Sequence, residues 1–83
     1  MKIPRGLGGE ELAQLLNRYD YQVTRQTGSY IRLTTNREGE YHIAIPKHKT
    51  LKIGTLNGIL GDIAGHLKLK KETLIDELFG GRK

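Results

Sequence analysis

The sequence has 83 residues, and its 14 Lys and Arg against 9 Asp and Glu give a net charge of +5 and a pI near 9.7. We predict a single domain with a small core over residues 1–83. There is no cysteine, which excludes disulfides and thiolate metal sites, and the three histidines lack the spacing of a structural zinc site. No apolar run approaches the ~18 residues of a membrane span, and no signal-peptide pattern is seen. We therefore expect no metal, no cofactor, no membrane segment and a cytoplasmic location.

The excess of positive charge is concentrated in the middle of the sequence. Residues 1–20 and 56–83 are nearly balanced, whereas residues 21–55 carry only two acidic side chains, Glu38 and Glu40. The basic residues of this segment are Arg25, Arg32, Arg37, Lys47, Lys49 and Lys52. Such a polarised distribution suits a polyanion such as a nucleic acid, and a solvated basic surface is the alternative interpretation.

The first expected helix begins at Gly9, after a lead-in over residues 1–8. Glu10 and Glu11 fall in its first turn, where the helix dipole favours acidic side chains. We expect it to end between Arg18 and Asp20. Apolar residues recur along it at helical spacing: Leu12, Leu15, Leu16 and Tyr19.

Three short stretches with alternating apolar and polar residues follow, over residues 21–26, 30–35 and 41–46. In the first of them, Tyr21 and Val23 are predicted to share a face. Turns are expected between the stretches, and Gly28 is free to take a positive φ in the first turn. The pattern predicts an antiparallel meander with one apolar face and one polar face.

A basic connector over residues 47–53 leads to a second helix, which Thr55 is predicted to cap. The apolar stripe of this helix is Leu56, Ile59, Leu60, Ile63 and Leu67. An added helix over residues 71–79 carries four apolar side chains, for which core packing and a contact with another chain are both open. With a core over residues 9–67, the order is α-β-β-β-α plus one helix. This is an α+β sandwich with the topology of double-stranded-RNA-binding domains.

The apolar residues select one register for the second and third strands. Pairing Ile31 with Ile45 keeps the apolar residues of both strands on one face, whereas a slip by one residue splits that face. The register places Tyr30 opposite Pro46 on the outer face. At ~3.3 Å per residue, His42 then lies roughly 13 Å from Tyr30 and cannot cooperate with it directly.

Polar and basic residues gather at the end of the sheet where Tyr30 lies: Gly28, Ser29, Lys47, His48, Lys49 and Lys52. A turn with free backbone N–H groups beside cations and an imidazole is typical of a phosphate site. A solvated strand end with incidental lysines is the alternative. His42 is interpreted as an exposed strand residue and His66 as a structural one, and the other three tyrosines are assigned to the core.

Three motifs stand in order along the sequence: Gly-Ser at the start of the second strand, Ile-Pro-x-His after the third, and Leu-Lys-x-Gly-Thr-Leu at the entry to the second helix. With LAQLLNRYDY in the first helix, they cover most of the chain, which resembles the HicA toxin family, also called YcfA-like. The resemblance implies a double-stranded-RNA-binding-like fold and an mRNA interferase that cleaves transcripts without a metal. It also implies a HicB-type antitoxin that covers the active surface.

In that family the residue after Gly-Ser is a histidine, taken as catalytic, and here the position is Tyr30. The matching residues that the sequence retains are Arg25, Gly28, Ser29, Arg32, Pro46, His48, Gly54 and Thr55. Metal-free cleavage of RNA needs a base for the 2′-OH and an acid for the leaving oxygen. Because an imidazole titrates near 6.5 and a phenol near 10, we expect greatly reduced cleavage and largely intact binding.

Three explanations of Tyr30 remain open. In the first, Tyr30 is a substitution introduced so that a toxic protein could be produced. In the second, it marks a natural relative that does not cleave RNA. In the third, His48 carries out the chemistry and Tyr30 is a hydrogen-bond donor that orients it. The enzyme hypothesis places Tyr30 and His48 at the scissile bond. It assigns RNA contacts to Arg25, Gly28, Ser29, Arg32, Lys47, Lys49 and Lys52. The alternatives are a module that binds RNA or only its antitoxin, and a purely structural interaction domain, and a homodimer is compatible with each.

Overall fold

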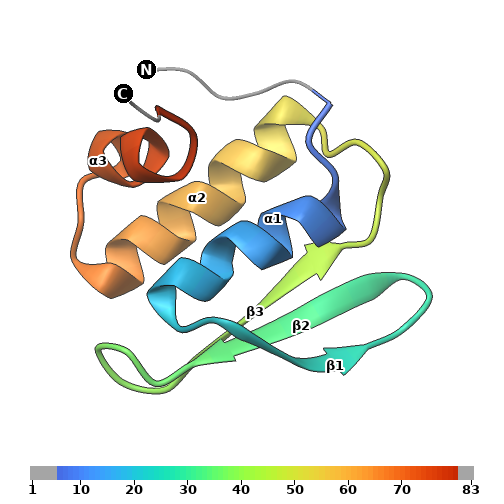
Figure 1. The fold of residues 1–83 in the computed structure, drawn as a ribbon, viewed down its shortest axis with the longest axis horizontal. Coiled ribbons are helices and arrows are strands. Elements are labelled where there is room, and N and C mark those ends of the chain that lie inside the picture. The colour runs from blue at the N-terminus through green and yellow to red at the C-terminus, as the bar shows by residue number, and fades with distance from the viewer. Residues whose placement is uncertain (1–5, 81–83) are drawn as a thin grey trace.

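The structure is a computed structural model that describes residues 6–80, so the first five residues of the predicted lead-in lie outside the described residues. The helices are α1 (Gly9–Leu16), α2 (Ile53–Leu67) and α3 (Lys71–Ile75), with a 3₁₀ turn over Asn17–Tyr19 and a π-helical turn over Asp76–Gly80. The strands are β1 (Gln22–Gln26), β2 (Tyr30–Thr35) and β3 (Tyr41–Pro46). This confirms the α+β fold with the double-stranded-RNA-binding-like order α-β-β-β-α and an added helix (Figure 1). None of the described helices has the length and apolar character needed to cross a membrane.

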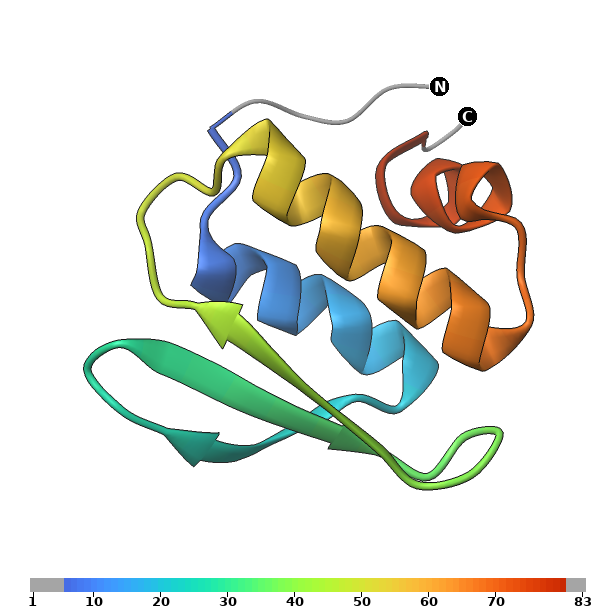
Figure 2. The same ribbon diagram turned by 180° about the vertical axis from the view of Figure 1, so that it is seen from behind.

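The helices lie on one side of a three-stranded antiparallel sheet with the order β1-β2-β3. In two opposite views, α1 and α2 run next to each other over the same face (Figures 1 and 2). Three segments gather at one end of the molecule: the β1–β2 turn, the connector from β3 to α2 and the N-terminal end of α1. The β2–β3 turn lies at the opposite end.

The predicted register of β2 and β3 is confirmed. Ile31 pairs with Ile45, and both side chains are buried. Tyr30 pairs with Pro46 at the beginning of β2, whereas His42 pairs with a residue near the end of that strand. Tyr30 and His42 therefore lie at opposite ends of the outer face, as expected.

Strand β1 departs from the predicted alternation at Thr24. Val23 and Arg25 pair with consecutive residues of β2, so Thr24 is an extra residue that forms a bulge. The bulge reverses the alternation and places Arg25 opposite Arg32, on the outer face. Val23 pairs with the buried Leu33, so it lies on the helix-covered face of the sheet, where the sequence placed it together with Tyr21. Tyr21 precedes the strand and is buried, whereas Val23 is 49% exposed because β1 is an edge strand.

One apolar core fills the space between the sheet and the helices. Its fully buried apolar side chains are Leu12, Leu16, Tyr21, Ile31, Leu33, Ile45, Leu56, Leu60, Ile63, Leu74 and Ile75. The whole predicted stripe of α2 is buried, which confirms it. This burial stabilises α2 despite Gly58, Gly61 and Gly65, each of which lowers helix propensity by about 1 kcal/mol relative to alanine.

Helix α2 begins earlier than predicted, because Lys52 and not Thr55 is its N-cap residue. Lys52 has an extended backbone (φ −67°, ψ 145°), and no side chain caps the helix. Leu51 immediately precedes the N-cap residue, and Leu56 is the fourth residue of the helix. Both side chains are buried. This hydrophobic staple determines where the helix starts, so Thr55 lies within the first turn.

The C-terminal helix completes the core. Leu74, Ile75 and Leu78 are buried within the single chain, which decides in favour of core packing. Glu77 contacts the end of the α1 segment: its carboxylate accepts from the Tyr19 hydroxyl and its carbonyl from the Arg18 guanidinium. Burial and the neighbouring Glu77 raise the pKa of Tyr19 to about 12.

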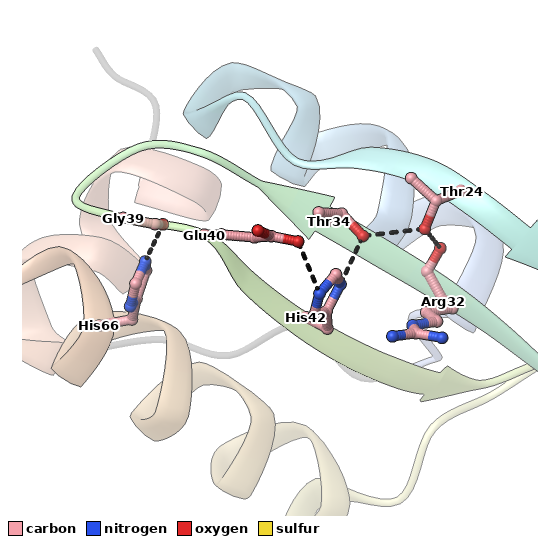
Figure 3. A network of polar contacts seen from close by, with 7 residues as sticks. All are labelled: Thr24, Arg32, Thr34, Gly39, Glu40, His42 and His66. Atoms are coloured by element: carbon pink, nitrogen blue, oxygen red, sulfur yellow. Dashed lines mark hydrogen bonds and ion pairs between the residues drawn. The ribbon is translucent and has the colours of Figure 1, made fainter.

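The structural role predicted for His66 is confirmed. Its Nε2 lies 2.9 Å from the Arg37 carbonyl oxygen and 3.0 Å from that of Gly39. Its ring stacks on Tyr41 with centroids 4.3 Å apart. His66 thereby attaches the β2–β3 turn to the C-terminal end of α2 (Figure 3).

Candidate functional site

The N-terminal end of α1 packs directly against the connector that follows β3. The Gly9 amide donates a hydrogen bond to the His48 carbonyl at 3.0 Å. A Cβ at Gly9 would lie 2.1 Å from the Pro46 carbonyl oxygen, and one at Gly8 would lie 2.6 Å from the Lys49 carbonyl oxygen. Because a side chain at either position would collide with backbone, this contact fixes the first turn of α1 beside the connector.

A surface depression of about 510 Å³ opens at this contact, and we call it the connector depression. Its lining residues are Gly8, Glu10, Glu11, Gly28, Lys47, His48 and Lys49. Four of the predicted site residues therefore lie together, namely Gly28, Lys47, His48 and Lys49. The walls come from the three segments that gather at one end of the molecule in Figures 1 and 2.

The connector depression contains two carboxylates, those of Glu10 and Glu11, that were not among the predicted site residues. Glu10 Oε2 lies 3.7 Å from Lys47 Nζ, and the two side chains are 65% and 29% exposed. Because the carboxylate is largely exposed and the separation is long, the attraction is modest and an incoming anion can compete for the ammonium group. Glu11 has a different partner: its Oε1 accepts a hydrogen bond from the Gly8 amide at 2.8 Å and caps α1. The adjacent glycines before Glu10 were the one sequence signal that this turn approaches another segment.

The β1–β2 turn is closed by its own hydrogen bonds. The amides of Ser29 and Tyr30 both donate to Thr27 Oγ1 at 3.1 Å, and the Thr27 amide donates to the Tyr30 carbonyl. We expected free N–H groups in this turn, and this is wrong for Thr27, Ser29 and Tyr30. The Thr27 hydroxyl accepts from the amides of Ser29 and Tyr30, and the Tyr30 carbonyl accepts from the amide of Thr27. Gly28 also does not take a positive φ. The Ser29 carbonyl accepts from the Lys47 amide at 2.9 Å and so joins the turn to the connector.

Tyr30 and His48 lie at the same end of the sheet. Tyr30 is 37% exposed on the outer face and pairs with Pro46, two residues before His48. His48 is exposed and lines the connector depression, whereas Tyr30 is not among the lining residues. Of the two predicted catalytic residues, only His48 therefore belongs to the depression itself.

The remaining predicted site residues lie outside the connector depression. Arg25 and Arg32 are exposed and directly opposite each other on β1 and β2, in what we call the arginine pair. Lys52 is exposed at the start of α2. The predicted residues thus form one group around the depression and one on the outer sheet face, and Lys52 belongs to neither.

A chain of polar contacts crosses the outer sheet face (Figure 3). His42 Nδ1 lies 2.8 Å from Thr34 Oγ1, and its Nε2 lies 3.1 Å from Glu40 Oε2. Thr34 Oγ1 in turn lies 2.9 Å from Thr24 Oγ1. Both ring nitrogens of His42 are therefore engaged, and His42 is the exposed strand residue that the sequence predicted.

The fold and the grouping of cations at one end of the sheet define a small basic domain with the architecture of double-stranded-RNA-binding domains. The chain belongs to the HicA toxin family: the family model described as the HicA toxin of bacterial toxin–antitoxin systems matches residues 9–73. The match runs from the first residue of α1 into α3, and the chain is accordingly a toxin whose family is normally paired with an antitoxin. No match was found among curated proteins or among solved structures.

Proposed function

We propose that this chain is an endoribonuclease that acts on mRNA and whose cleavage is slowed by the tyrosine at position 30. The observation that carries the proposal is the connector depression, where the exposed imidazole of His48 lies between two lysines around one open space. Cleavage of a phosphodiester without a metal uses an acid or base of this kind together with cations that stabilise the charge on the phosphate. Three other depressions on the surface of the described residues contain no histidine.

The arginine pair supports a phosphate contact on the sheet face. Like charges directly opposite each other on neighbouring strands repel and destabilise the sheet. A phosphate bound between Arg25 and Arg32 would relieve this repulsion and would accept charge-assisted hydrogen bonds from both guanidinium groups. Lys47, Lys49 and Lys52 would then contact neighbouring phosphates, with Gly28 and Ser29 close to the RNA backbone.

Tyr30 is the reason to expect slow cleavage. A phenol ordinarily titrates about 3 units above an imidazole, and this difference corresponds to about 4 kcal/mol of unfavourable proton transfer near neutral pH. A tyrosine can still stack on a base or donate a hydrogen bond to a phosphate. We therefore expect RNA binding to survive at this position while the rate of cleavage falls.

The proposed partner is a HicB-type antitoxin that covers the connector depression and so prevents access of RNA. A toxin that acts on mRNA would work in the cytoplasm. A second candidate function is a module that holds RNA or the antitoxin without cutting, and the exposed phenol of Tyr30 where the family carries a histidine favours it.

The test is an RNA cleavage assay of this chain beside Tyr30→His, with RNA binding measured under the same conditions. We expect both forms to bind RNA, with an affinity that falls steeply as salt rises, and Tyr30→His to cleave faster. If both bind RNA and neither cleaves it, the endoribonuclease proposal is wrong and the binding module remains. If neither binds RNA, the antitoxin alone remains as partner.

A further inference from the structure

We propose that Glu10 and His48 are a general base and a general acid for RNA cleavage in the connector depression. This inference rests on the proposed endoribonuclease function and assigns the slow cleavage that remains with Tyr30 in place to a pair of groups other than position 30. Both residues line the same depression although they are distant in the sequence. The contact of Gly9 with the connector brings them together, because the residue after Gly9 is Glu10 and the carbonyl that Gly9 binds belongs to His48.

Lys47 has two roles in this arrangement. Its ammonium group holds the Glu10 carboxylate at 3.7 Å and keeps a negative charge in a depression that must also accept a phosphate. Together with Lys49, it also supplies positive charge that would stabilise the phosphate during attack. Because the Lys47 side chain is only 29% exposed, its position is better defined than that of a free surface lysine.

The reaction can be written with all atoms accounted for. The Glu10 carboxylate takes the proton of the ribose 2′-OH, and the 2′ oxygen forms a bond to phosphorus. The bond from phosphorus to the 5′ oxygen breaks, and that oxygen takes a proton from the His48 imidazolium. The products are a 2′,3′-cyclic phosphate and a 5′-hydroxyl end, and solvent then restores the protons of both side chains.

Neighbouring acidic and imidazole groups are less suited to these roles. The Glu11 carboxylate already accepts a hydrogen bond from the Gly8 amide and thereby stabilises the start of α1. On the sheet face, the His42 ring is engaged at both nitrogens by Thr34 and Glu40. Glu10 and His48 are thus the carboxylate and imidazole that remain available around the depression.

A carboxylate base and an imidazolium acid give a bell-shaped dependence of kcat/KM on pH. The rate falls at low pH because the base must be ionised, and it falls at high pH because the acid must be protonated. The other charged groups that face this pair are Glu11 from α1 and Lys47 and Lys49 from the connector.

The experiment compares single-turnover cleavage by the full chain, Glu10→Gln, His48→Gln and the double variant on one RNA. Glu72→Gln, an exposed residue of α3 outside the depression, is the matched control. We expect each single variant to lose roughly 100-fold or more in rate. The double variant should lose little more than either single one, because the two groups act in one step. Glu10→Gln should bind RNA at least as tightly as the parent, since a negative charge is removed, and the parent products should carry cyclic phosphate ends.

The outcomes separate this inference from the proposed function. A Glu10→Gln variant that is folded by circular dichroism and cleaves as fast as the parent overturns the inference and leaves the endoribonuclease proposal in place. The same holds if the parent binds RNA without cleaving and Tyr30→His cleaves. If the parent does not bind RNA, the proposed function itself fails.

Discussion

Gly9 lies so close to Pro46 that a Cβ on residue 9 would be 2.1 Å from the Pro46 carbonyl oxygen. The contact joins the first turn of α1 to the end of β3, two elements that are far apart in the sequence. It also places Glu10 beside Lys47 in the connector depression. The shape of the candidate site therefore depends on a glycine with no chemistry of its own.

We expect Gly9→Ala to lower the free energy of unfolding by about 2–3 kcal/mol, because the backbone of α1 or of the connector must move to admit the methyl group. The midpoint of thermal unfolding should fall by roughly 10–20 °C. Gly58→Ala is the matched control: nothing lies within 4 Å of its Cβ position in α2. It should raise stability by about 0.5–1 kcal/mol. Equal stability of the two variants would show that the close approach is absent.

The arginine pair predicts a change in RNA binding without a loss of folding stability. Arg32→Ala should weaken RNA binding and reduce the slope of log affinity against log salt by about one, because one phosphate contact is lost. Since the repulsion from Arg25 is removed, the free energy of unfolding should stay the same or rise. Lys70→Ala, an exposed lysine between α2 and α3, serves as the control and should leave the salt slope unchanged. An unchanged slope for Arg32→Ala would exclude a phosphate at this pair.

A buried hydroxyl without a partner gives a prediction for Tyr21. Its side chain is fully buried, and its hydroxyl has no hydrogen-bond partner among the described residues. Because a buried unsatisfied polar group costs about 1–3 kcal/mol, Tyr21→Phe should be at least as stable as the parent. Urea unfolding at neutral pH measures this difference. A marked loss of stability would mean that the hydroxyl is satisfied in solution.

The same residue contributes to the pH dependence of stability. Burial raises the pKa of Tyr21 to about 12, and burial together with Glu77 raises that of Tyr19 to about 12. The unfolded chain loses both protons near pH 10, so the folded chain binds more protons between pH 10 and 12. The free energy of unfolding should therefore fall as pH rises through this range. Below pH 10 both tyrosines are protonated in the folded and unfolded chain, so they should add no pH dependence. Tyr21→Phe should show a shallower fall by thermal unfolding at pH 9 to 11.5.

Features that depend on local alternation or helical spacing could be predicted from the sequence. The pairing of Ile31 with Ile45 follows from burial of one strand face, and the buried stripe of α2 follows from its spacing. Both features depend on residues close together in the chain or on a single pair of strands. The same patterns predicted the order of elements, which the structure confirms and which agrees with the fold that the resemblance to the HicA family implies.

Features that depend on contacts across the fold could not be predicted. The bulge at Thr24 brings Arg25 to the outer face, and it is defined only by pairing with β2. The closure of the β1–β2 turn depends on which amides the Thr27 hydroxyl reaches. Glu10 was interpreted as a helix-dipole residue, because the sequence does not reveal that α1 begins against the connector. The basic residues of the candidate site could therefore be predicted from the sequence, whereas the Glu10 carboxylate could not.

The most direct test of the central claim is the cleavage rate of one RNA at saturating concentration by this chain and by Tyr30→His. We predict that both bind the RNA with similar affinity and that Tyr30→His cleaves it at least roughly 100-fold faster, as expected when a side chain able to transfer protons at neutral pH is restored. Saturating binding with no cleavage by either form would contradict the assignment of this surface as the active site of an endoribonuclease.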